Sequence, residues 1–431
     1  MRQDLPDVRA VPGSRSRELS ERLANAESPA VVARRHAREH EAIVYERGDG
    51  INVFDVDGNR FVDLTCGFGA LPLGHGDALV QRALVAQSEK AWLALGDVYA
   101  TEPKVALCEA LAALYPEPDA RVVLGLSGAD AVTAALKTAM LATKRAGVIA
   151  FTGGYHGLSY APLAACGFKP SFRDPFREQL GRHVTFAPYP SSEDESNDCI
   201  LHMQNALISG QIGAVLIEPI LGRGGCVVPP PLFIRRVRDL CDRAGALLVA
   251  DEVWTGLGRS GSMLMSVSQG VLADVVCVGK ALGGGLPISA CIGSAKVMAP
   301  WGEHGGATIH TATHFGNPLA CATALVTMAR IRDEALADRA RRTGDDFIEL
   351  LQKKFEGDAR VRAVRGRGAM LGIQLDGQPR ALRAMRALLE RGWIVLTGGI
   401  AGDVITLTPP LAIDLRVLRA FGDALAQSLD A

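Results

Sequence analysis

Short aliphatic runs rich in β-branched residues, each bounded by glycine or a charge, recur through the middle of the chain. The clearest lie at residues 213–218, 246–253 and 274–280. Runs of this length with so little polar interruption indicate strands that are buried on both faces of a sheet. Segments with helical periodicity lie between them, for example residues 233–245. The pattern therefore predicts an α/β protein with a mostly parallel sheet.

Three other stretches follow different patterns. Residues 48–64 alternate apolar and polar positions around an Asp-Gly turn, which predicts a β-hairpin. Residues 168–197 contain four prolines and predict a long irregular connection that could cover the active site. Near the C-terminus, a strand, a helix and two further strands predict a second, α+β domain, with bounds at residues 361–375, 380–391, 393–397 and 404–408.

These patterns divide the chain into four expected segments. The first is a polar, arginine-rich arm, and the second contains the hairpin, which we expect to dock on the C-terminal domain. The third is the large domain and the fourth is the smaller one. Their expected bounds are 1–45, 46–75, 76–325 and 326–431.

Composition narrows the class of protein without identifying it. The 431 residues are 48% hydrophobic and 22% charged, an ordinary enzyme mixture, and the net charge of -1 gives no reason to expect nucleic acid or an anionic membrane as partner. Charges interrupt every apolar run before the roughly 18 residues that a membrane span needs. The nine cysteines are scattered without ligand spacing, so we expect no metal site, reduced thiols and a cytoplasmic location.

A carboxylate and an amine end two of the predicted strands. Asp251 and Lys280 each follow an aliphatic run and each precede a glycine-dense loop. Ligands bind at the carboxyl ends of strands in open α/β sheets, and glycine lets a flat ligand approach the backbone. Alone, either residue is more often a helix cap or a solvated charge. Together they are the two groups that pyridoxal phosphate needs, an amine for its Schiff base and an acid for its ring nitrogen.

The residues around this pair resemble a known signature. Residues 251–261 read Asp-Glu-Val-Trp-Thr-Gly-Leu-Gly-Arg-Ser-Gly, and residues 279–288 read Gly-Lys-Ala-Leu-Gly-Gly-Gly-Leu-Pro-Ile. Both are similar to the signature of the class III, ω-amino acid type, pyridoxal-phosphate aminotransferases, and the resemblance runs from about residue 48 to the C-terminus. It implies the aspartate aminotransferase-like fold, in which a large domain with a mostly parallel seven-stranded sheet lies beside a smaller α+β domain.

Candidate cofactor contacts lie on both sides of this signature. A strand followed by Ser127, Gly128 and a helix N-terminus is an arrangement that holds a phosphate, although Ala129 stands where the family has a hydroxyl. Tyr155 can stack on the pyridine, and the resemblance places Val253 on its opposite face. The full set of expected contacts is Ser127, Gly128, Ala129, Tyr155, His156, Glu218, Asp251, Val253, Lys280 and Thr313.

The resemblance also implies a second subunit. The segment at residues 310–320 is similar to one in which a threonine, here Thr313, reaches the phosphate in the neighbouring subunit. We therefore expect a homodimer with shared active sites.

Four positions depart from the family pattern where substrates are recognised. Arg223 replaces a glutamate that usually gates a C-terminal arginine, and Thr406 replaces that arginine. Leu158 replaces an arginine of the acetylornithine type, and Trp254 replaces a glutamine that contacts the cofactor ring oxygen. These changes argue against GABA or acetylornithine as substrate. They suggest that Arg223, whose planar fork suits a carboxylate, has taken over carboxylate recognition. The competing interpretation is that Arg223 pairs with Glu218 or Glu252 and faces no substrate.

The expected activity is ping-pong transamination between an amino-acid or amine donor and a keto-acid or aldehyde acceptor, with Lys280 and Asp251 as the catalytic residues. The same pair serves aminomutases and amino-acid epimerases, which return nitrogen to the same molecule, so these remain the alternative. Decarboxylation and a cofactor-binding regulator without catalysis are further alternatives.

Overall fold

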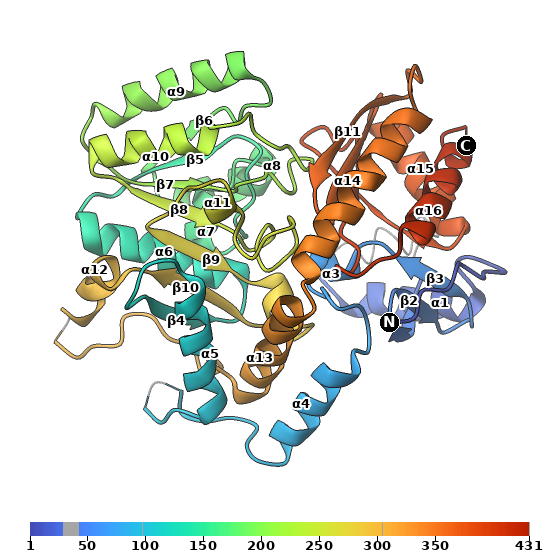
Figure 1. The fold of residues 1–431 in the computed structure, drawn as a ribbon, viewed down its shortest axis with the longest axis horizontal. Helices are drawn as coiled ribbons and strands as arrows, with labels where there is room; N and C mark the ends of the chain where they lie inside the picture. Colours follow the sequence, from blue (N-terminus) through green and yellow to red (C-terminus); the bar gives the residue numbers. More distant parts are fainter. Residues whose placement is uncertain (29–42, 97, 304, 431) are drawn as a thin grey trace.

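A computed structural model describes residues 1–28, 43–96, 98–303 and 305–430 of the chain. Figure 1 shows two lobes, one built around a large sheet and one formed by the C-terminal elements together with the N-terminal hairpin. Residues 29–42 of the expected N-terminal arm lie outside the described residues. In the rest of the arm, helix α1 spans Ser14–Ala26.

The large sheet has seven strands in the order β4-β10-β9-β8-β7-β5-β6. Strand β10 is antiparallel to both of its neighbours, and the remaining pairs are parallel. The predicted α/β fold with a mostly parallel seven-stranded sheet is therefore confirmed. The strands are β4 (Arg121–Gly125), β5 (Gly147–Phe151), β6 (Val184–Ala187), β7 (Ile212–Ile217), β8 (Leu247–Asp251), β9 (Val275–Val278) and β10 (Ser289–Gly293).

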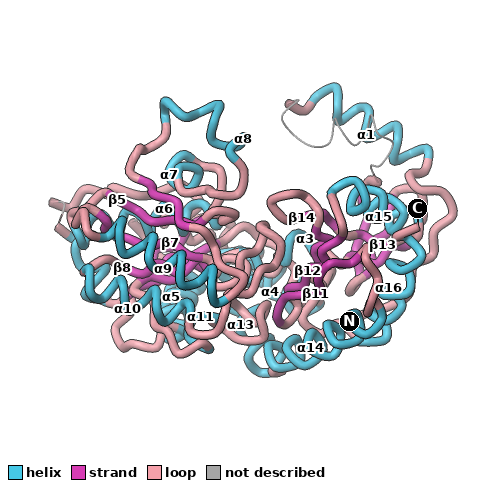
Figure 2. Tube along the Cα trace, turned by 90° about the horizontal axis from the view of Figure 1, so that it is seen from above, coloured by secondary structure: helices cyan, strands magenta, loops and turns pink. Residues whose placement is uncertain are grey.

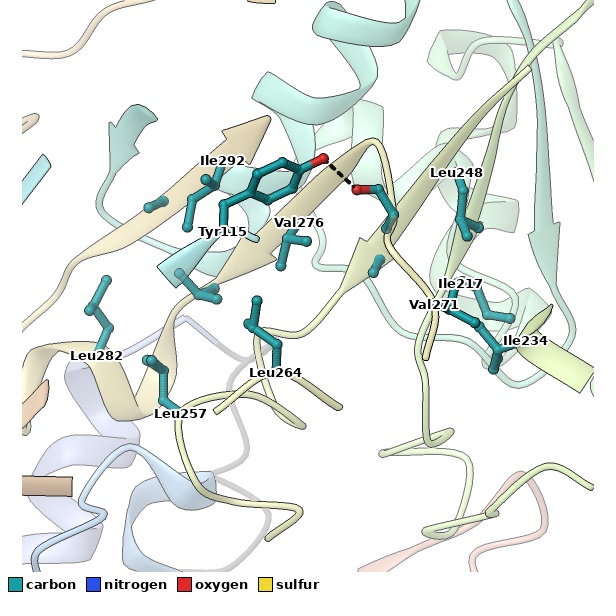
Figure 3. Packing of buried hydrophobic residues seen from close by; sticks show 14 of the residues in the cluster. Tyr115, Ile217, Ile234, Leu248, Leu257, Leu264, Val271, Val276, Leu282 and Ile292 are labelled. Atoms are coloured by element: carbon teal, nitrogen blue, oxygen red, sulfur yellow. Dashed lines mark hydrogen bonds between the residues drawn. The ribbon is translucent and has the colours of Figure 1, made fainter. Parts of the chain in front are cut away.

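Both faces of this sheet are buried, as the aliphatic runs predict. In β8, Leu248 and Ala250 face one core cluster while Val249 faces another. The first cluster also contains residues of helices α5 (Glu102–Leu114), α9 (Glu193–Leu207) and α10 (Phe233–Ala244), and the second contains the alanine-rich side of α6 (Gly128–Thr143). Figure 3 shows part of the first cluster, where Tyr115 lies near Val276. Its hydroxyl donates a hydrogen bond to the carbonyl oxygen of Ala273 at 2.8 Å.

The N-terminal hairpin lies in a sheet with a strand from the far end of the chain. Strands β1 (Tyr45–Asp49), β2 (Asn52–Asp55) and β3 (Arg60–Asp63) pair in sequence, and β13 (Trp393–Ile394) adds to β3 in parallel. Hairpin side chains such as Val62 and Leu64 belong to the same core cluster as the C-terminal helices. The predicted docking of the hairpin on the C-terminal elements is therefore confirmed.

A third sheet, of order β11-β12-β15-β14, completes the C-terminal lobe seen beside the large sheet in Figure 2. Its strands are β11 (Val361–Arg367), β12 (Met370–Leu375), β14 (Leu396–Gly398) and β15 (Val404–Leu407). The helices that cover it are α14 (Leu336–Lys354), α15 (Gln378–Glu390) and α16 (Leu415–Ser428).

Three expectations about local structure were wrong. The single strand expected at residues 393–397 is divided into β13 and β14, which belong to different sheets. Residues 168–197 are not an irregular connection throughout, because they contain α8 (Pro170–Arg173), η1 (Asp174–Gln179) and the edge strand β6. An edge strand tolerates nearby proline, so the proline count concealed it. Residues 361–375 form the two strands β11 and β12, with a turn at Gly368.

The remaining elements connect these layers. They are α3 (Cys66–Gly69), α4 (Ala78–Ser88), α7 (Tyr160–Ala164), α11 (Met265–Ser268), η2 (Lys280–Gly283), α12 (Ala295–Met298), η3 (Ala299–Gly302) and α13 (Pro318–Asp333). Among the described residues, none of the helices combines the length and the apolarity that crossing a membrane requires.

Candidate active site

The carboxylate and the amine singled out in the sequence lie at the ends of neighbouring strands. Asp251 is the last residue of β8 and pairs in register with Cys277 of β9. Lys280 begins the short helix η2, two residues after β9 ends. Its φ of 40° is in the left-handed region, which is costly for a residue with a side chain. The backbone at Lys280 is therefore held in a strained conformation at the strand end, as is common at functional sites.

Asp251 is bound by groups from two segments of the chain. Its Oδ2 lies 2.7 Å from Nδ1 of His156, and its Oδ1 accepts a hydrogen bond from the Val253 amide at 3.1 Å. Both the carboxylate and the imidazole are buried. Burial works against a charged imidazole, but the hydrogen bond and the charge of Asp251 outweigh it and raise the pKa of His156. The Asp251 carboxylate is thus oriented by a protonatable partner on one side.

Lys280 has an apolar and aromatic environment. Its Nζ lies 4.7 Å from the centre of the Trp254 ring, within cation–π range. Burial has the largest effect and lowers the pKa of the Lys280 amine. The charges of Asp251 and Glu218 oppose it, and those of Arg223 and Arg259 add smaller decreases. An amine with a lowered pKa is more readily deprotonated near neutral pH, which a nucleophile or base needs.

The turn before α6 has the geometry of a phosphate site. The Ser127 side chain caps the helix, and the Asp130 carboxylate accepts hydrogen bonds from the backbone amide and the hydroxyl of Ser127. The backbone amides of Gly128 and Ala129 lie in the first turn of α6, where an amide has no acceptor within the helix. These two amides can therefore bind an anion. Gly128 must be small here, because a Cβ would lie 2.7 Å from Cγ1 of Val253.

Sequence reasoning missed one residue that holds this turn. The Ser289 hydroxyl donates a hydrogen bond to the carbonyl oxygen of Ser127 at 2.6 Å, from the first residue of β10. A fully buried serine in an aliphatic strand is the only signal in the sequence, and serine is common enough that this signal is weak.

Glu218 follows β7 directly and is buried. Its carboxylate accepts hydrogen bonds from the backbone amides of Tyr155, at 2.8 Å, and Gly222, at 3.0 Å. Burial raises the pKa of Glu218 to about 7, with a further increase from the charge of Asp251. Glu218 therefore ties together the two loops that bear Tyr155 and Arg223.

A cavity of about 310 Å³ opens over the Lys280 amine. It is lined by Gly67, Phe68, Tyr155, Arg223, Trp254, Lys280, Leu396, Thr397, Gly398 and Thr406. The wall comes from the turn after the N-terminal hairpin, from loops of the large sheet and from the C-terminal strands β14 and β15. Thr406, at the position of the family's arginine, lines this cavity and donates a hydrogen bond to the Leu396 carbonyl oxygen.

Arg223 lies among aromatic rings, and in the part of the chain that the structure describes it forms no ion pair with a carboxylate. Its guanidinium carbon is 4.7 Å from the ring centre of Tyr155, 5.3 Å from that of Phe168 and 5.7 Å from that of Phe172. Glu218 is occupied by two amides, and the Glu252 carboxylate is occupied by the segment at residues 255–266. The competing interpretation, that Arg223 pairs with one of these acids, was therefore wrong.

Thr313 lies apart from the Lys280 cavity. It lines a separate cavity of about 370 Å³ together with Ala312 and residues 93–96 and 98. Several large apolar side chains of that neighbouring segment are exposed to solvent in the single chain, namely Trp92 (68%), Leu95 (65%), Val98 (68%) and Tyr99 (67%).

The fold also assembles a group that the cysteine spacing does not reveal. The ligand atoms of Asp63, Cys66 and His75 lie within 4.8 Å of one another. The Asp63 carboxylate is already engaged, by His75 on one oxygen and by Thr65 and the Cys66 amide on the other. Burial raises the pKa of the Cys66 thiol, which opposes the thiolate that a metal requires.

The residues around Lys280 fit pyridoxal phosphate. The strand-end amine and acid can bind its aldehyde and its ring nitrogen, and Tyr155 lines the cavity that holds the Lys280 amine. The first-turn amides of Gly128 and Ala129 have no acceptor within α6 and can bind a phosphate. His156 contributes a buried Nε2 without a hydrogen-bond partner in the described residues. A polar atom of this kind is expected where a bound group or water completes the site.

Comparisons with known proteins agree with this chemistry. Residues 33–429 match the family model described as Aminotransferase class-III. The chain is 33% identical over 389 residues to an acetylornithine aminotransferase of Methanothermobacter thermautotrophicus, covering 89% of this chain and 93% of the relative. It is 36% identical over 397 residues to the acetylornithine aminotransferase of Corynebacterium efficiens, covering 89% and 91%.

Solved structures give the same result. An amine transaminase from an uncultivated Pseudomonas species, in a form with pyridoxal phosphate bound, superposes with a TM-score of 0.84 at 29% identity, over 91% of this chain and 96% of that one. The ornithine aminotransferase of Toxoplasma gondii superposes with a TM-score of 0.79 at 29% identity, over 90% and 89%.

Proposed function

This chain belongs to the class III aminotransferases and is a pyridoxal phosphate-dependent aminotransferase, and from that premise we propose which of its residues carry the reaction and which donors it accepts. The aminomutase and epimerase alternatives find no support, because none of the relatives named above is described as either.

The catalytic residues are Lys280 and Asp251. When bound, the cofactor supplies an electron sink that stabilises the carbanion formed at the donor carbon. Lys280 would hold the cofactor through its aldehyde group, and the Lys280 Nζ would carry the proton that leaves the donor carbon. The lowered pKa of the Lys280 amine supports that role. Asp251 keeps a proton on the ring nitrogen, and the contact between its Oδ2 and His156 supports the orientation that this requires.

The remaining contacts follow from the loops around this pair. Gly128 and Ala129 hold the phosphate through their amides, together with Ser127. Tyr155 and Val253 enclose the ring, a role supported for Tyr155 by its place in the cavity wall and for Val253 by its packing on Gly128. Glu218 contributes by fixing the Tyr155 and Gly222 amides, so its part in cofactor binding is indirect.

The donor is proposed to carry a carboxylate and an apolar body. Arg223 is the one arginine in the lining of the Lys280 cavity, and it makes no ion pair with a carboxylate in the described part of the chain. Phe68, Tyr155, Trp254 and Leu396 supply apolar and aromatic surface for the rest of the donor. Aromatic packing places a guanidinium without neutralising it, so Arg223 keeps its charge for a substrate. The relatives named above include acetylornithine aminotransferases. In this chain Leu158 and Thr406 replace the two arginines that the family pattern associates with carboxylated substrates, so acetylornithine is not proposed as the donor.

A donor panel tests this assignment. Each amino acid is compared with the matching amine, in which hydrogen replaces the carboxylate, and the change in cofactor absorbance is followed without an acceptor. We expect the amino acids with apolar side chains to react with a half-saturation concentration at least about tenfold lower than that of the matched amines, the order of one charge-assisted hydrogen-bond pair. Equal half-saturation concentrations for both members of every pair would contradict the role of Arg223 but leave the roles of Lys280 and Asp251 untouched.

We also infer a homodimer in which Thr313 serves the partner's site. The exposed Trp92, Leu95, Val98 and Tyr99 form an apolar surface next to the cavity that Thr313 lines, which supports burial of this segment by a second copy. Residues 76–325 are proposed as the cofactor-binding domain, with residues 46–75 and 326–431 forming the smaller one. The nine free cysteines support a cytoplasmic location.

A further inference from the structure

Arg259 is a buried cation without a carboxylate partner among the described residues. It is 1% exposed and follows the glycine-rich turn after β8. Its guanidinium donates hydrogen bonds to three backbone carbonyl oxygens, those of Gly69 at 3.3 Å, Ala369 at 3.1 Å and Pro409. Burying a guanidinium without a counter-charge is costly, so a fold that retains one gains something specific from it.

The three carbonyl groups come from three distant parts of the chain. Gly69 follows the N-terminal hairpin, Ala369 lies in the turn between β11 and β12, and Pro409 follows β15. The backbone carbonyl of Arg259 accepts the Ala369 amide at 2.9 Å as well. Arg259 therefore joins the loop of the large sheet that follows Asp251 to both halves of the opposite lobe.

The first of these partners belongs to a strained turn in the cavity wall. Cys66, Gly67, Phe68 and Gly69 have φ values of 43°, 62°, 58° and 83°, so four successive residues are left-handed. Two of them carry side chains that disfavour this region. Gly67 and Phe68 line the cavity over Lys280, and Arg259 holds the carbonyl at the end of the same turn.

Trp254 links Arg259 to the amine. A Cβ on Gly69 would lie 3.1 Å from Nε1 of Trp254 and 3.3 Å from Nε of Arg259, so both N–H groups lie beside Gly69, and neither has a partner in the described residues. The face of the same indole lies 4.7 Å from Nζ of Lys280. The Trp254 side chain thus lies near both the Arg259 guanidinium and the Lys280 amine.

We propose that Arg259 is a positioning residue for transamination, which fixes the turn bearing Gly67 and Phe68 and places a positive charge without a carboxylate partner beside Trp254. This inference rests on the proposed function, because it takes Lys280 as the reacting amine. After burial, which has the largest effect, the charges of Arg223 and Arg259 contribute to the lowered pKa of the Lys280 amine. The hydrogen bonds of the Arg259 guanidinium hold the turn that forms part of the cavity wall. The positive charge of Arg259 favours the neutral form of the Lys280 amine.

Two substitutions separate the effect of the Arg259 hydrogen bonds from the effect of the Arg259 charge. Arg259→Lys keeps the charge and loses the three-way fork, whereas Arg259→Met keeps only the apolar stem. The protonation of Lys280 is read in the cofactor-free full-length protein, from the pH dependence of its labelling by an amine-reactive acylating reagent, quantified by mass spectrometry. Steady-state KM and kcat are measured on the cofactor-loaded enzyme.

We expect Arg259→Met to raise the midpoint of Lys280 labelling, because it removes a positive charge that lowers the pKa of the Lys280 amine. Arg259→Lys should leave the midpoint within about 0.3 unit while raising donor KM about tenfold, because the turn that bears Phe68 loses the hydrogen bond to its Gly69 carbonyl. An unchanged midpoint in Arg259→Met would overturn the electrostatic role. An unchanged KM in Arg259→Lys would overturn the positioning role, and this variant keeps the test open if Arg259→Met fails to fold.

A matched control comes from the other end of the same strands. Arg238 is part-buried and donates a hydrogen bond to Asp274, whose carboxylate also accepts the Leu248 amide near the start of β8. Arg238→Met should lower the thermal midpoint of unfolding without moving the labelling midpoint. If it moves the labelling midpoint as far as Arg259→Met does, the effect reflects general loosening and the proposal is wrong. Failure of the proposed function itself would differ, since Lys280→Ala would then retain activity.

Discussion

The two halves of the proposed active site are built in opposite ways. On the proposed cofactor side, Lys280, Asp251 and the turn at residues 127–129 lie at the ends of strands or at a helix N-terminus. On the proposed substrate side, Arg223 and the cavity wall lie on loops and strands from three parts of the chain. A rigid sheet suits chemistry that does not change, while loops allow a different substrate on the same frame.

The comparison has a measurable consequence. Damage on the cofactor side should affect all donors alike, because every donor meets the same amine and acid. Damage on the substrate side should divide donors by their chemistry. The following predictions test this division in order of expected effect.

Lys280→Ala should have the largest effect. Loss of the amine removes both the covalent anchor and the proton carrier, so kcat should fall by about 10⁴-fold or more for every donor. The measurement is the rate of keto-acid formation after reconstitution, with the absorbance of the bound cofactor as a second reading. Lys353→Ala, on the exposed face of α14, is the control and should match the wild type. Residual activity near the wild-type rate would remove Lys280 from the mechanism.

Arg223→Ala should divide the donors. For donors with a carboxylate, KM should rise about 10- to 100-fold, the range of roughly 1.4–3 kcal/mol for a charge-assisted contact. For the matched amines, KM should change less than about twofold. Arg223→Lys should give intermediate values, because an ammonium keeps the charge but not the fork. An equal rise in KM for carboxylated donors and matched amines would contradict the distinction between the two halves of the site.

Glu218 lies on the boundary between the halves and should give a pH-dependent stability. Its pKa is about 7 in the folded protein, above the value of 4.5 for an unperturbed glutamate. The folded state therefore binds more protons between these values, so its stability is full below about pH 4.5 and declines as pH rises through 7. The decline from this group is on the order of 1–3 kcal/mol.

Glu218→Gln should reduce this dependence. Thermal unfolding midpoints of the cofactor-free protein, measured at pH 5 and pH 8, should differ less in the variant than in the wild type. The pKa of His156 is also raised, so the stabilisation that His156 contributes falls as pH rises as well. This residue is present in both proteins, so its effect does not change the comparison. Equal pH dependence in the two proteins would mean that Glu218 is already ionised throughout this range.

Ser289→Ala should have the smallest effect. Removing the hydroxyl that holds the Ser127 carbonyl loosens the phosphate turn, so the Kd for pyridoxal phosphate should rise about fivefold, or roughly 1 kcal/mol. Relative donor preferences should stay the same, since the residue belongs to the cofactor side. Ser428→Ala removes a similar buried hydrogen bond in α16 and should leave the Kd unchanged. A shift in donor preference would show that the halves are coupled through β10.

The sequence determined the frame and the reactive pair. A residue at or near the end of a buried aliphatic strand has its position set by that strand, so the places of Asp251 and Lys280 could be predicted from local pattern, and the flanking motifs gave their expected roles. The hairpin at residues 48–64 was equally local, since alternation and an Asp-Gly turn specify it. Local composition failed at β6, where prolines beside an edge strand concealed it.

Tertiary structure alone decided which side chains meet. His156 reaches Asp251 across 95 residues of sequence, Ser289 reaches Ser127 across 162, and Arg259 reaches Gly69 across 190. Arg223 could be singled out from the sequence, but its location among three aromatic rings could not. Periodicity fixes the face of an element on which a side chain lies, because it depends on neighbours a few residues away. The partner of that side chain depends on how distant elements pack, and no local pattern contains that information.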